Sequence, residues 1–169
     1  MASSIQQCRE FVRTLEAYLD TQDLGALAAI RRGLGKGPGE ESAPYRFIGP
    51  YLADRTTEEE EKWYYAVAAL FAWHQISLPD EPEDQRLRNL GASFRQLADH
   101  VDASGTERRF IALLNCPASD LAAHLRHAIG LLKSRQVPVD WTLLLNDALH
   151  WSDERRFVQR RWARSYWRQ

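Results

Sequence analysis

The sequence is poor in cysteine and contains no long apolar segment. Its two cysteines among 169 residues, Cys8 and Cys116, are far apart and belong to no CxxC or CxxH pattern. We interpret them as small apolar residues of a reducing cytoplasm, without a disulfide or metal role. No apolar run approaches the roughly 20 residues that a membrane-spanning helix requires. The start, MASSIQQCREFV, lacks the basic segment and apolar core of a secretory signal, so a cytoplasmic protein is expected.

Motifs of the common enzyme classes are also absent from the sequence. It contains no GxxxxGKS/T or GxGxxG phosphate loop, no GxSxG nucleophile elbow and no HExxH zinc motif. His124 and His127 have a spacing that metal sites use, but a helical wheel places them at or beyond the rim of an apolar face. A metal-dependent hydrolase built on these histidines and nearby acids is therefore the weakest hypothesis. We expect no enzymatic activity, no cofactor and no bound metal.

Alternating strand patterns are missing as well, and nearly every segment has helical periodicity. The pattern predicts an all-α fold, a helical bundle in two lobes with no sheet. The linker LPDEPEDQ predicts the boundary between an N-terminal helical subdomain of residues 1–79 and a C-terminal basic helical subdomain of residues 84–169. Helices of the second subdomain are expected at about 84–99, 105–115, 119–134, 140–150 and 153–167.

Side chains that cap helix N-termini mark the expected helix starts. The clearest pair is Thr57 with Glu60, a Thr-x-x-Glu capping box ahead of the segment KWYYAVAALFAWH. We expect this helix to be buried and central, because it is apolar nearly all round. The other predicted caps are Ser3 or Ser4, Asp20 or Thr21 before DLGALAAIRR, Ser104 with Glu107, Ser119, Asp140 and Ser152.

Charge is distributed unevenly along this nearly neutral chain. Residues 1–99 contain 11 lysines and arginines against 16 acids, a net charge of −5. Residues 100–169 contain 11 against 7, a net charge of +4, which leaves the formal total at −1. This asymmetry predicts one region that meets an anion and another that does not.

The final stretch, RRFVQRRWARSYW, combines an apolar stripe with clustered arginines. Val158, Trp162 and Tyr166 recur at i, i+4 and i+8 and predict the buried face of a helix. Phe157 and Trp167 fall nearer the arginine side, and we expect an amphipathic helix rather than a stacking platform. So many like charges require either acidic partners within the protein or between subunits, or an external phosphate. The candidate phosphate contacts here are Arg155, Arg156, Arg160, Arg161 and Arg164.

Two further basic clusters lie at helix ends. Arg31 and Arg32 end one predicted helix and precede a glycine-rich loop that carries Lys36, an arrangement that suits dipole compensation or a phosphate clamp. Arg108 and Arg109 fall in the expected first turn of another helix. The helix dipole disfavours cations there, and this local cost hints at function.

Arg126 and Lys133 share one face of a predicted helix, with the small residue Gly130 beside them. A glycine next to a basic pair permits close approach of a phosphate backbone. Each basic residue alone is typical of a protein surface. Their joint bias toward arginine, whose guanidinium forks onto phosphate, predicts a nucleic-acid-binding surface.

Four segments together resemble the CasB family, the small subunit of the type I-E CRISPR surveillance complex, Cascade. They are AAIRRGLGKG, YYAVAALFAW, ERRFIALLNCPASDLAAHLRHAIGLL and VDWTLLLNDALHW with its basic tail. The likeness runs in order from about residue 5 to residue 167 and implies an all-helical, non-catalytic protein with two subdomains. The family's basic residues match Arg31, Arg32, Arg108, Arg109 and Arg126 of this sequence, whereas relatives vary in the basic residues of the tail.

The resemblance also implies the partners. A CasB subunit supports the guide RNA–target DNA heteroduplex and the displaced DNA strand, together with other Cascade subunits and a second copy of itself. Because base pairing by the guide reads the sequence, backbone contact by the protein suffices. The competing hypothesis is a helical scaffold, in which the acidic first half of one copy binds the basic second half of another and no nucleic acid is bound.

Overall fold

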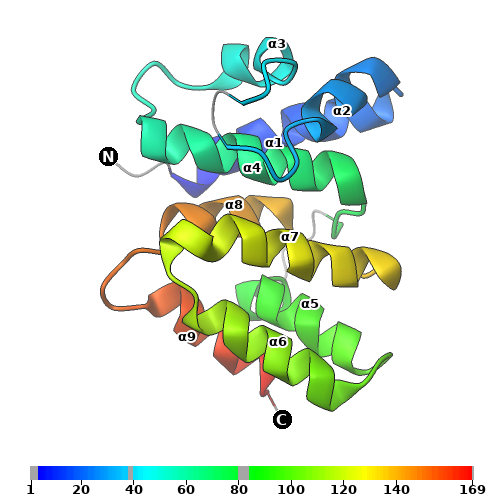
Figure 1. Ribbon diagram of the computed structural model, residues 1–169, viewed down its shortest axis with the longest axis vertical. Coiled ribbons are helices and arrows are strands. Elements are labelled where there is room, and N and C mark those ends of the chain that lie inside the picture. Colours follow the sequence, from blue (N-terminus) through cyan, green and yellow to red (C-terminus); the bar gives the residue numbers. More distant parts are fainter. Residues whose placement is uncertain (1–3, 38–39, 80–83, 169) are drawn as a thin grey trace. The chain divides into compact units, whose positions relative to one another are not determined.

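Helices make up the regular structure of this protein, as predicted. The computed structural model describes residues 4–37, 40–79 and 84–168, and over these ranges it contains nine α-helices and no β-strand (Figure 1). An isolated bridge joins Ser77 to Val139. The all-α class is therefore confirmed. The chain divides into two compact units, Met1–Gln75 and Ile76–Gln169.

The N-terminal unit is built around helix α4 (Glu58–His74). Its predicted capping box is confirmed, because the Thr57 hydroxyl accepts from the Glu60 backbone N–H and the Glu60 carboxylate accepts from the Thr57 N–H at 3.0 Å. The four glutamates of the first turn suit the positive end of the helix dipole. Buried side chains occur on most sides of α4, and the largest are Trp63, Tyr64 and Phe71.

Smaller elements pack on α4 within the same unit. Edge-to-face contact between the Phe11 and Tyr64 rings, with centroids 4.8 Å apart, joins the first helix to α4. The third helix ends at Ile48, and one 3₁₀ turn that contains Pro50 follows it. This is expected because proline lacks the N–H that would continue the helix. These elements are α1 (Ile5–Asp20), α2 (Leu24–Arg31), α3 (Tyr45–Ile48) and the 3₁₀ turn Gly49–Tyr51.

The predicted cap of α2 is wrong. Neither Asp20 nor Thr21 caps this helix, because Asp23 Oδ1 accepts the Ala26 backbone N–H at 2.9 Å. Thr21 instead closes the C-terminus of α1. Gln22 then adopts a left-handed conformation with φ 56°, which turns the chain before Asp23 can begin a new helix. For α1 the predicted cap at Ser4 is confirmed, whereas Ser3 lies outside the described residues.

The C-terminal unit contains five α-helices in its described part. Helices α6 and α7 run side by side in opposite directions, and α5 packs against both α6 and α9 (Figure 1). The helix predicted over residues 84–99 is shorter than expected, because Asn89 caps it and only a 3₁₀ turn precedes it. The elements are the 3₁₀ turn Gln85–Leu87, α5 (Leu90–Ala98), α6 (Ala103–Asn115), α7 (Ala118–Ser134), α8 (Trp141–Leu149) and α9 (Phe157–Tyr166).

Three of the four caps predicted for these helices are wrong. Asp102 caps α6 by accepting from the Ser104 and Gly105 backbone amides at 3.2 and 2.9 Å, so Ser104 lies inside the helix. An earlier carboxylate thus starts the helix two residues before the predicted hydroxyl. Helix α7 begins after Pro117 without a side-chain cap, in place of the predicted Ser119.

The cap predicted for α8 is confirmed, and the cap predicted for α9 is wrong. Asp140 accepts the Leu143 N–H at 2.9 Å and caps α8. Ser152 does not cap α9, because the chain makes a further turn before this helix. That turn ends at Arg156, which is left-handed with φ 51° and contributes no side-chain cap.

The tightest packing in the C-terminal unit is between α5 and α9. A Cβ atom built on Gly91 would overlap the backbone carbonyl of Trp162. Nearby, the Asn89 amide donates to Ser165 Oγ at 2.8 Å, and the Phe110 ring stacks on Tyr166 with centroids 4.4 Å apart. Gly91 therefore sets the distance at which α9 can lie against α5.

Both cysteines are buried, and they are not joined in a disulfide. Cys8 belongs to the N-terminal unit and Cys116 to the C-terminal unit. Burial raises the pKa of Cys116 to about 11, which keeps this thiol protonated and unreactive near neutral pH. Their interpretation as small apolar core residues agrees with this burial.

We expect Gly91→Ala to lower the free energy of unfolding by about 3 kcal/mol, because the new methyl group meets rigid backbone rather than a mobile side chain. Urea denaturation followed by circular dichroism measures the change. The matched control is Gly25→Ala, at an exposed position of α2 where the added methyl meets only Asp23 Oδ1 at 3.6 Å. That variant should gain roughly 0.5 kcal/mol from reduced chain entropy. Equal stabilities for the two variants would contradict the close α5–α9 contact.

Candidate nucleic-acid interface

Cations of the N-terminal unit gather at the end of α2 and in the following loop. Arg31 lies in the last helical turn and Arg32 is the C-cap residue, so both compensate the negative helix end, and both are exposed. Lys36 Nζ lies 3.2 Å from Glu41 Oε2. The Ala43 backbone amide, Lys36 and Arg32 together hold the pKa of Glu41 below its usual value. Glu41 thus neutralises part of this cluster, a partner that the sequence did not identify.

Helix α6 presents the predicted Arg108 and Arg109 to solvent. The helix begins at Ala103, two residues before the predicted start, and both arginines therefore lie in its second turn. The argument from an unfavourable dipole position is wrong, because the field of the helix end acts mainly on the first turn. Both side chains are exposed, and within the described part of the chain neither guanidinium forms an ion pair or hydrogen bond.

An open groove of about 310 Å³ separates α6 from α7 and also reaches Phe94 of α5. Its polar lining consists of Arg109, His124 and His127, so the structure brings the two histidines beside an arginine rather than beside acids. A zinc site uses at least three protein ligands, whereas this groove offers two. The described residues contain no group of three or more metal-ligating side chains. The other lining residues are Ala112, Leu113, Ala128 and Leu131.

Arg126 and Lys133 are exposed on the opposite edge of α7 from His124 and His127. They are seven residues apart and therefore share one helix face, as predicted. We use the name α6–α7 basic surface for these four exposed positions, Arg108 and Arg109 on α6 and Arg126 and Lys133 on α7. Of the acids within these two helices, Asp120 is exposed and Glu107 is half-buried.

Two arginines at the start of the basic tail have partners within the protein. The Arg155 guanidinium binds the Asp153 carboxylate through Nε and Nη2, at 3.0 and 2.9 Å. Arg156 donates from Nη2 to the Leu114 carbonyl at 2.6 Å and so satisfies a free acceptor at the C-terminus of α6. Both side chains are thus committed to local structure, although both are exposed.

Arg161 has a buried acidic partner in α8. The Asp147 side chain is only 1% exposed, and it accepts from Arg161 Nη2 at 2.5 Å and from Trp162 Nε1 at 2.7 Å. Arg161 is among the predicted phosphate contacts, but the side chain is half-buried and turned toward α8. Burial raises the pKa of Asp147 to about 6, although Arg161 and Trp162 both act to lower it.

Arg160 and Arg164 lie on the outer face of α9, and Trp167 is the C-cap residue of this helix. All three are exposed, and across the described ranges neither arginine side chain has a hydrogen bond or ion pair. The predicted apolar stripe is confirmed, since Val158, Trp162 and Tyr166 are buried. The five tail arginines therefore separate into three with intramolecular partners and two that face solvent.

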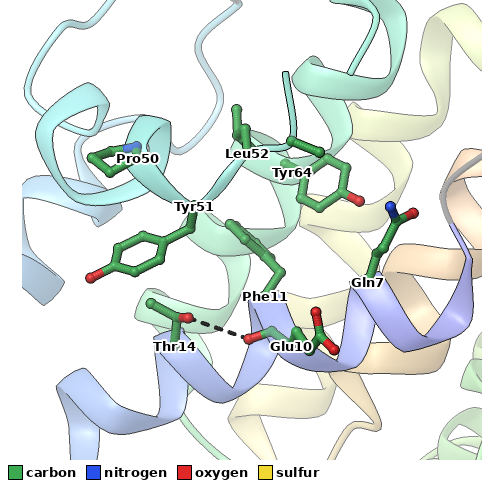
Figure 2. A pocket seen from close by; sticks show the side chains of 9 residues that line it. Gln7, Glu10, Phe11, Thr14, Pro50, Tyr51, Leu52 and Tyr64 are labelled. Carbon is green, nitrogen blue, oxygen red and sulfur yellow. Dashed lines mark hydrogen bonds between the residues drawn. The ribbon is translucent and has the colours of Figure 1, made fainter. Parts of the chain in front are cut away.

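A second hollow, in the N-terminal unit, has the wrong chemistry for phosphate. This cavity of about 320 Å³ lies between α1, α4 and the segment after Pro50, and Phe11 and Tyr64 line it (Figure 2). The ionisable residues in its lining are Glu10 and the tyrosines, with no lysine or arginine. A carboxylate repels phosphate, so the candidate anion contacts lie elsewhere.

Taken together, fold and surface define a class: an all-helical protein with an arginine-rich exposed surface on its C-terminal unit. Over the described ranges, no helix combines the length and the apolar character needed to cross a membrane.

Comparison with known proteins gives the family. The family model for CRISPR-associated protein Cse2 matches residues 26–167, and the chain belongs to this family. The Cse2 protein of Thermus thermophilus is 34% identical over 147 residues, covering 84% of this chain and 78% of the relative. Similarity to solved CasB structures confirms the resemblance to this family.

Two solved structures are closely similar. The crystal structure of M. ruber CasB superimposes with a TM-score of 0.79 at 33% identity, covering 96% of this chain and 93% of that one. A chain of a CRISPR RNA-guided surveillance complex gives a TM-score of 0.79 at 29% identity, covering 96% and 92%. The similarity therefore extends over both units of the chain.

Asp147 should make stability fall as the pH rises. Its pKa is about 6 in the folded protein against an ordinary value of 3.8, so the folded state binds this proton more tightly than the unfolded state. Its contribution to stability is therefore complete below about pH 4 and is lost as the pH rises through 6. We expect the free energy of unfolding of the wild type, relative to Asp147→Asn, to decline between about pH 4 and pH 7 in urea denaturation.

Asp153→Asn provides the opposite control. The Arg155 side chain lowers the pKa of Asp153 to about 2, so this contribution is present above about pH 4 and is lost as the pH falls toward 2. The difference between wild type and Asp153→Asn should therefore grow as the pH rises. If the free energy of unfolding of the wild type relative to Asp147→Asn also increased with pH, that result would contradict the raised pKa of Asp147.

Proposed function

We propose that this chain is the small, non-catalytic subunit of a type I-E CRISPR surveillance complex, Cascade, and that it binds nucleic acid without reading its sequence. Family membership and the similarity to a chain of a surveillance complex support the first part. The second part rests on one observation about the C-terminal unit. Arg108, Arg109, Arg126, Arg160 and Arg164 are among the exposed arginines there whose side chains have neither an acidic partner nor a hydrogen bond in the part of the chain that the structure describes.

Exposed arginines without acidic partners favour the binding of an external anion. Like charges close together on a helix repel, and a phosphate backbone removes that repulsion while accepting forked hydrogen bonds from each guanidinium. Release of condensed counterions from the nucleic acid supplies most of the binding free energy. Such contacts do not depend on the base sequence, which suits a subunit whose complex reads sequence by guide pairing.

The tail arginines are then divided between two roles. Arg160 and Arg164 contact phosphate, whereas Arg155, Arg156 and Arg161 hold the tail in place through Asp153, the end of α6 and Asp147. Arg31 and Arg32 form a second contact region in the N-terminal unit, with Glu41 moderating the charge of Lys36. Lys133 supplements the α6–α7 basic surface.

The proposed ligands are the guide RNA–target DNA heteroduplex and the displaced DNA strand. Holding the displaced strand prevents it from pairing again with the target, and so stabilises the R-loop. A groove or surface of cations suits this task because it follows a strand of any sequence. Other Cascade subunits and a second copy of the chain complete the proposed set of partners.

We expect the triple variant Arg108→Ala/Arg109→Ala/Arg126→Ala to bind single-stranded DNA more weakly, by at least about tenfold at low salt. The slope of log affinity against log salt should become shallower by about two, because roughly 0.7 counterions are released for each single-strand phosphate contact. Fluorescence anisotropy with a labelled oligonucleotide at several salt concentrations measures both quantities. In the assembled complex the same variant should weaken R-loop formation.

The matched control is Arg46→Ala/Arg55→Ala/Arg86→Ala, which removes the same charge from three exposed positions outside the proposed interface. It should retain most of the affinity and the salt slope of the wild type. Equal binding by the two triple variants would contradict the proposed interface. Salt-sensitive self-association without nucleic-acid binding would favour the scaffold instead.

A further inference from the structure

One exposed aromatic ring lies at the C-terminal end of α9. Arg160 and Arg164 are one turn apart on the outer face of this helix, and Trp167, three residues after Arg164, is its C-cap residue. Trp167 is 43% exposed. Of the other five tryptophans of the chain, four are no more than 3% exposed and Trp73 is intermediate.

The structure holds this exposed ring in one orientation. Trp167 Nε1 donates to Glu107 Oε1 of α6 at 2.9 Å. The Phe110 and Tyr166 rings meet the indole edge-to-face, with centroids 5.6 and 5.0 Å away. One turn along α6 from Glu107, the side chain of Ile111 is 41% exposed and extends the apolar area. A large apolar ring is thus fixed in place and remains accessible to solvent.

We propose that Trp167 is a base-stacking position for single-stranded nucleic acid. The inference rests on the proposed function. It adds one contact residue, Trp167, and requires the nucleic acid to be single-stranded at that point. Arg164, three residues or about 4.5 Å of helical rise before Trp167, binds the phosphate of a nucleotide whose base stacks on the indole. Aromatic stacking suits sequence-independent binding because every base has a π-face.

The surrounding charge favours a nucleic acid over a protein segment as the occupant. Arg160 and Arg164 of the adjoining helix have no acidic partner in the described ranges. Glu107, the acid in contact with Trp167, already accepts the indole N–H. The ligand must also be unpaired at this point, because the faces of bases inside a duplex are covered by their neighbours. The displaced strand meets this condition, and the heteroduplex does not.

The test compares ligands with and without bases. Full-length wild type, Trp167→Ala and Trp167→Phe are titrated with an oligothymidylate and with an abasic oligonucleotide of the same length. The wild type should prefer the oligothymidylate by about tenfold, Trp167→Phe should keep most of this preference, and Trp167→Ala should lose it. The salt slopes should be the same for all three proteins, because no phosphate contact changes.

Arg164→Ala is the charge control, and it should weaken both ligands equally while reducing the salt slope. Thermal unfolding by circular dichroism shows whether Trp167→Ala keeps its fold, and Glu107→Gln, which retains an acceptor for the indole, should keep the preference for bases. An unchanged preference in folded Trp167→Ala would overturn the stacking role and leave the proposed function standing. A loss of subunit assembly with an unchanged preference would assign Trp167 to a protein contact and overturn it too. No nucleic-acid binding by any of the proteins would contradict both proposals.

Discussion

The rotation of α9 about its own axis is set by one buried carboxylate. Asp147 in α8 accepts from Arg161 and from the indole of Trp162, which are adjacent residues of α9. With these two side chains held inward, residues half a helical turn away must face solvent. Gly91 adds the second constraint by letting the backbone of α9 approach α5 closely. The solvent-facing positions of Arg160 and Arg164 are a consequence of this internal anchoring.

Net charge is a poor guide to this protein, because its cations perform two different tasks. A formal charge of −1 gives no indication of an anion-binding surface. Arg155, Arg156 and Arg161 stabilise the tail through partners within the chain, whereas the arginines of α6, α7 and the outer face of α9 have none in the described part. The second group remains available for phosphate. The same residue type thus serves structure and proposed recognition within a single helix.

Periodicity predicted the helices well, and local chemistry predicted their ends poorly. The buried stripe of Val158, Trp162 and Tyr166 and the Thr57–Glu60 box follow directly from spacing. Caps failed where two polar residues compete within a few positions, as at Ser104, because the backbone turn decides which one reaches the free amides. The partners of Arg161 and Trp167 lie 14 and 60 residues away, and only the tertiary fold reveals such contacts.

The most direct test of this account observes individual arginines during binding. Nuclear magnetic resonance of the arginine Nε–Hε groups, in a chain of 19.5 kDa, reports each guanidinium as single-stranded DNA is added. The account predicts salt-sensitive shifts of Arg108, Arg109, Arg126, Arg160 and Arg164, with Arg155 and Arg161 little changed. Shifts led by Arg155 and Arg161, or no shifts at low salt, would contradict it.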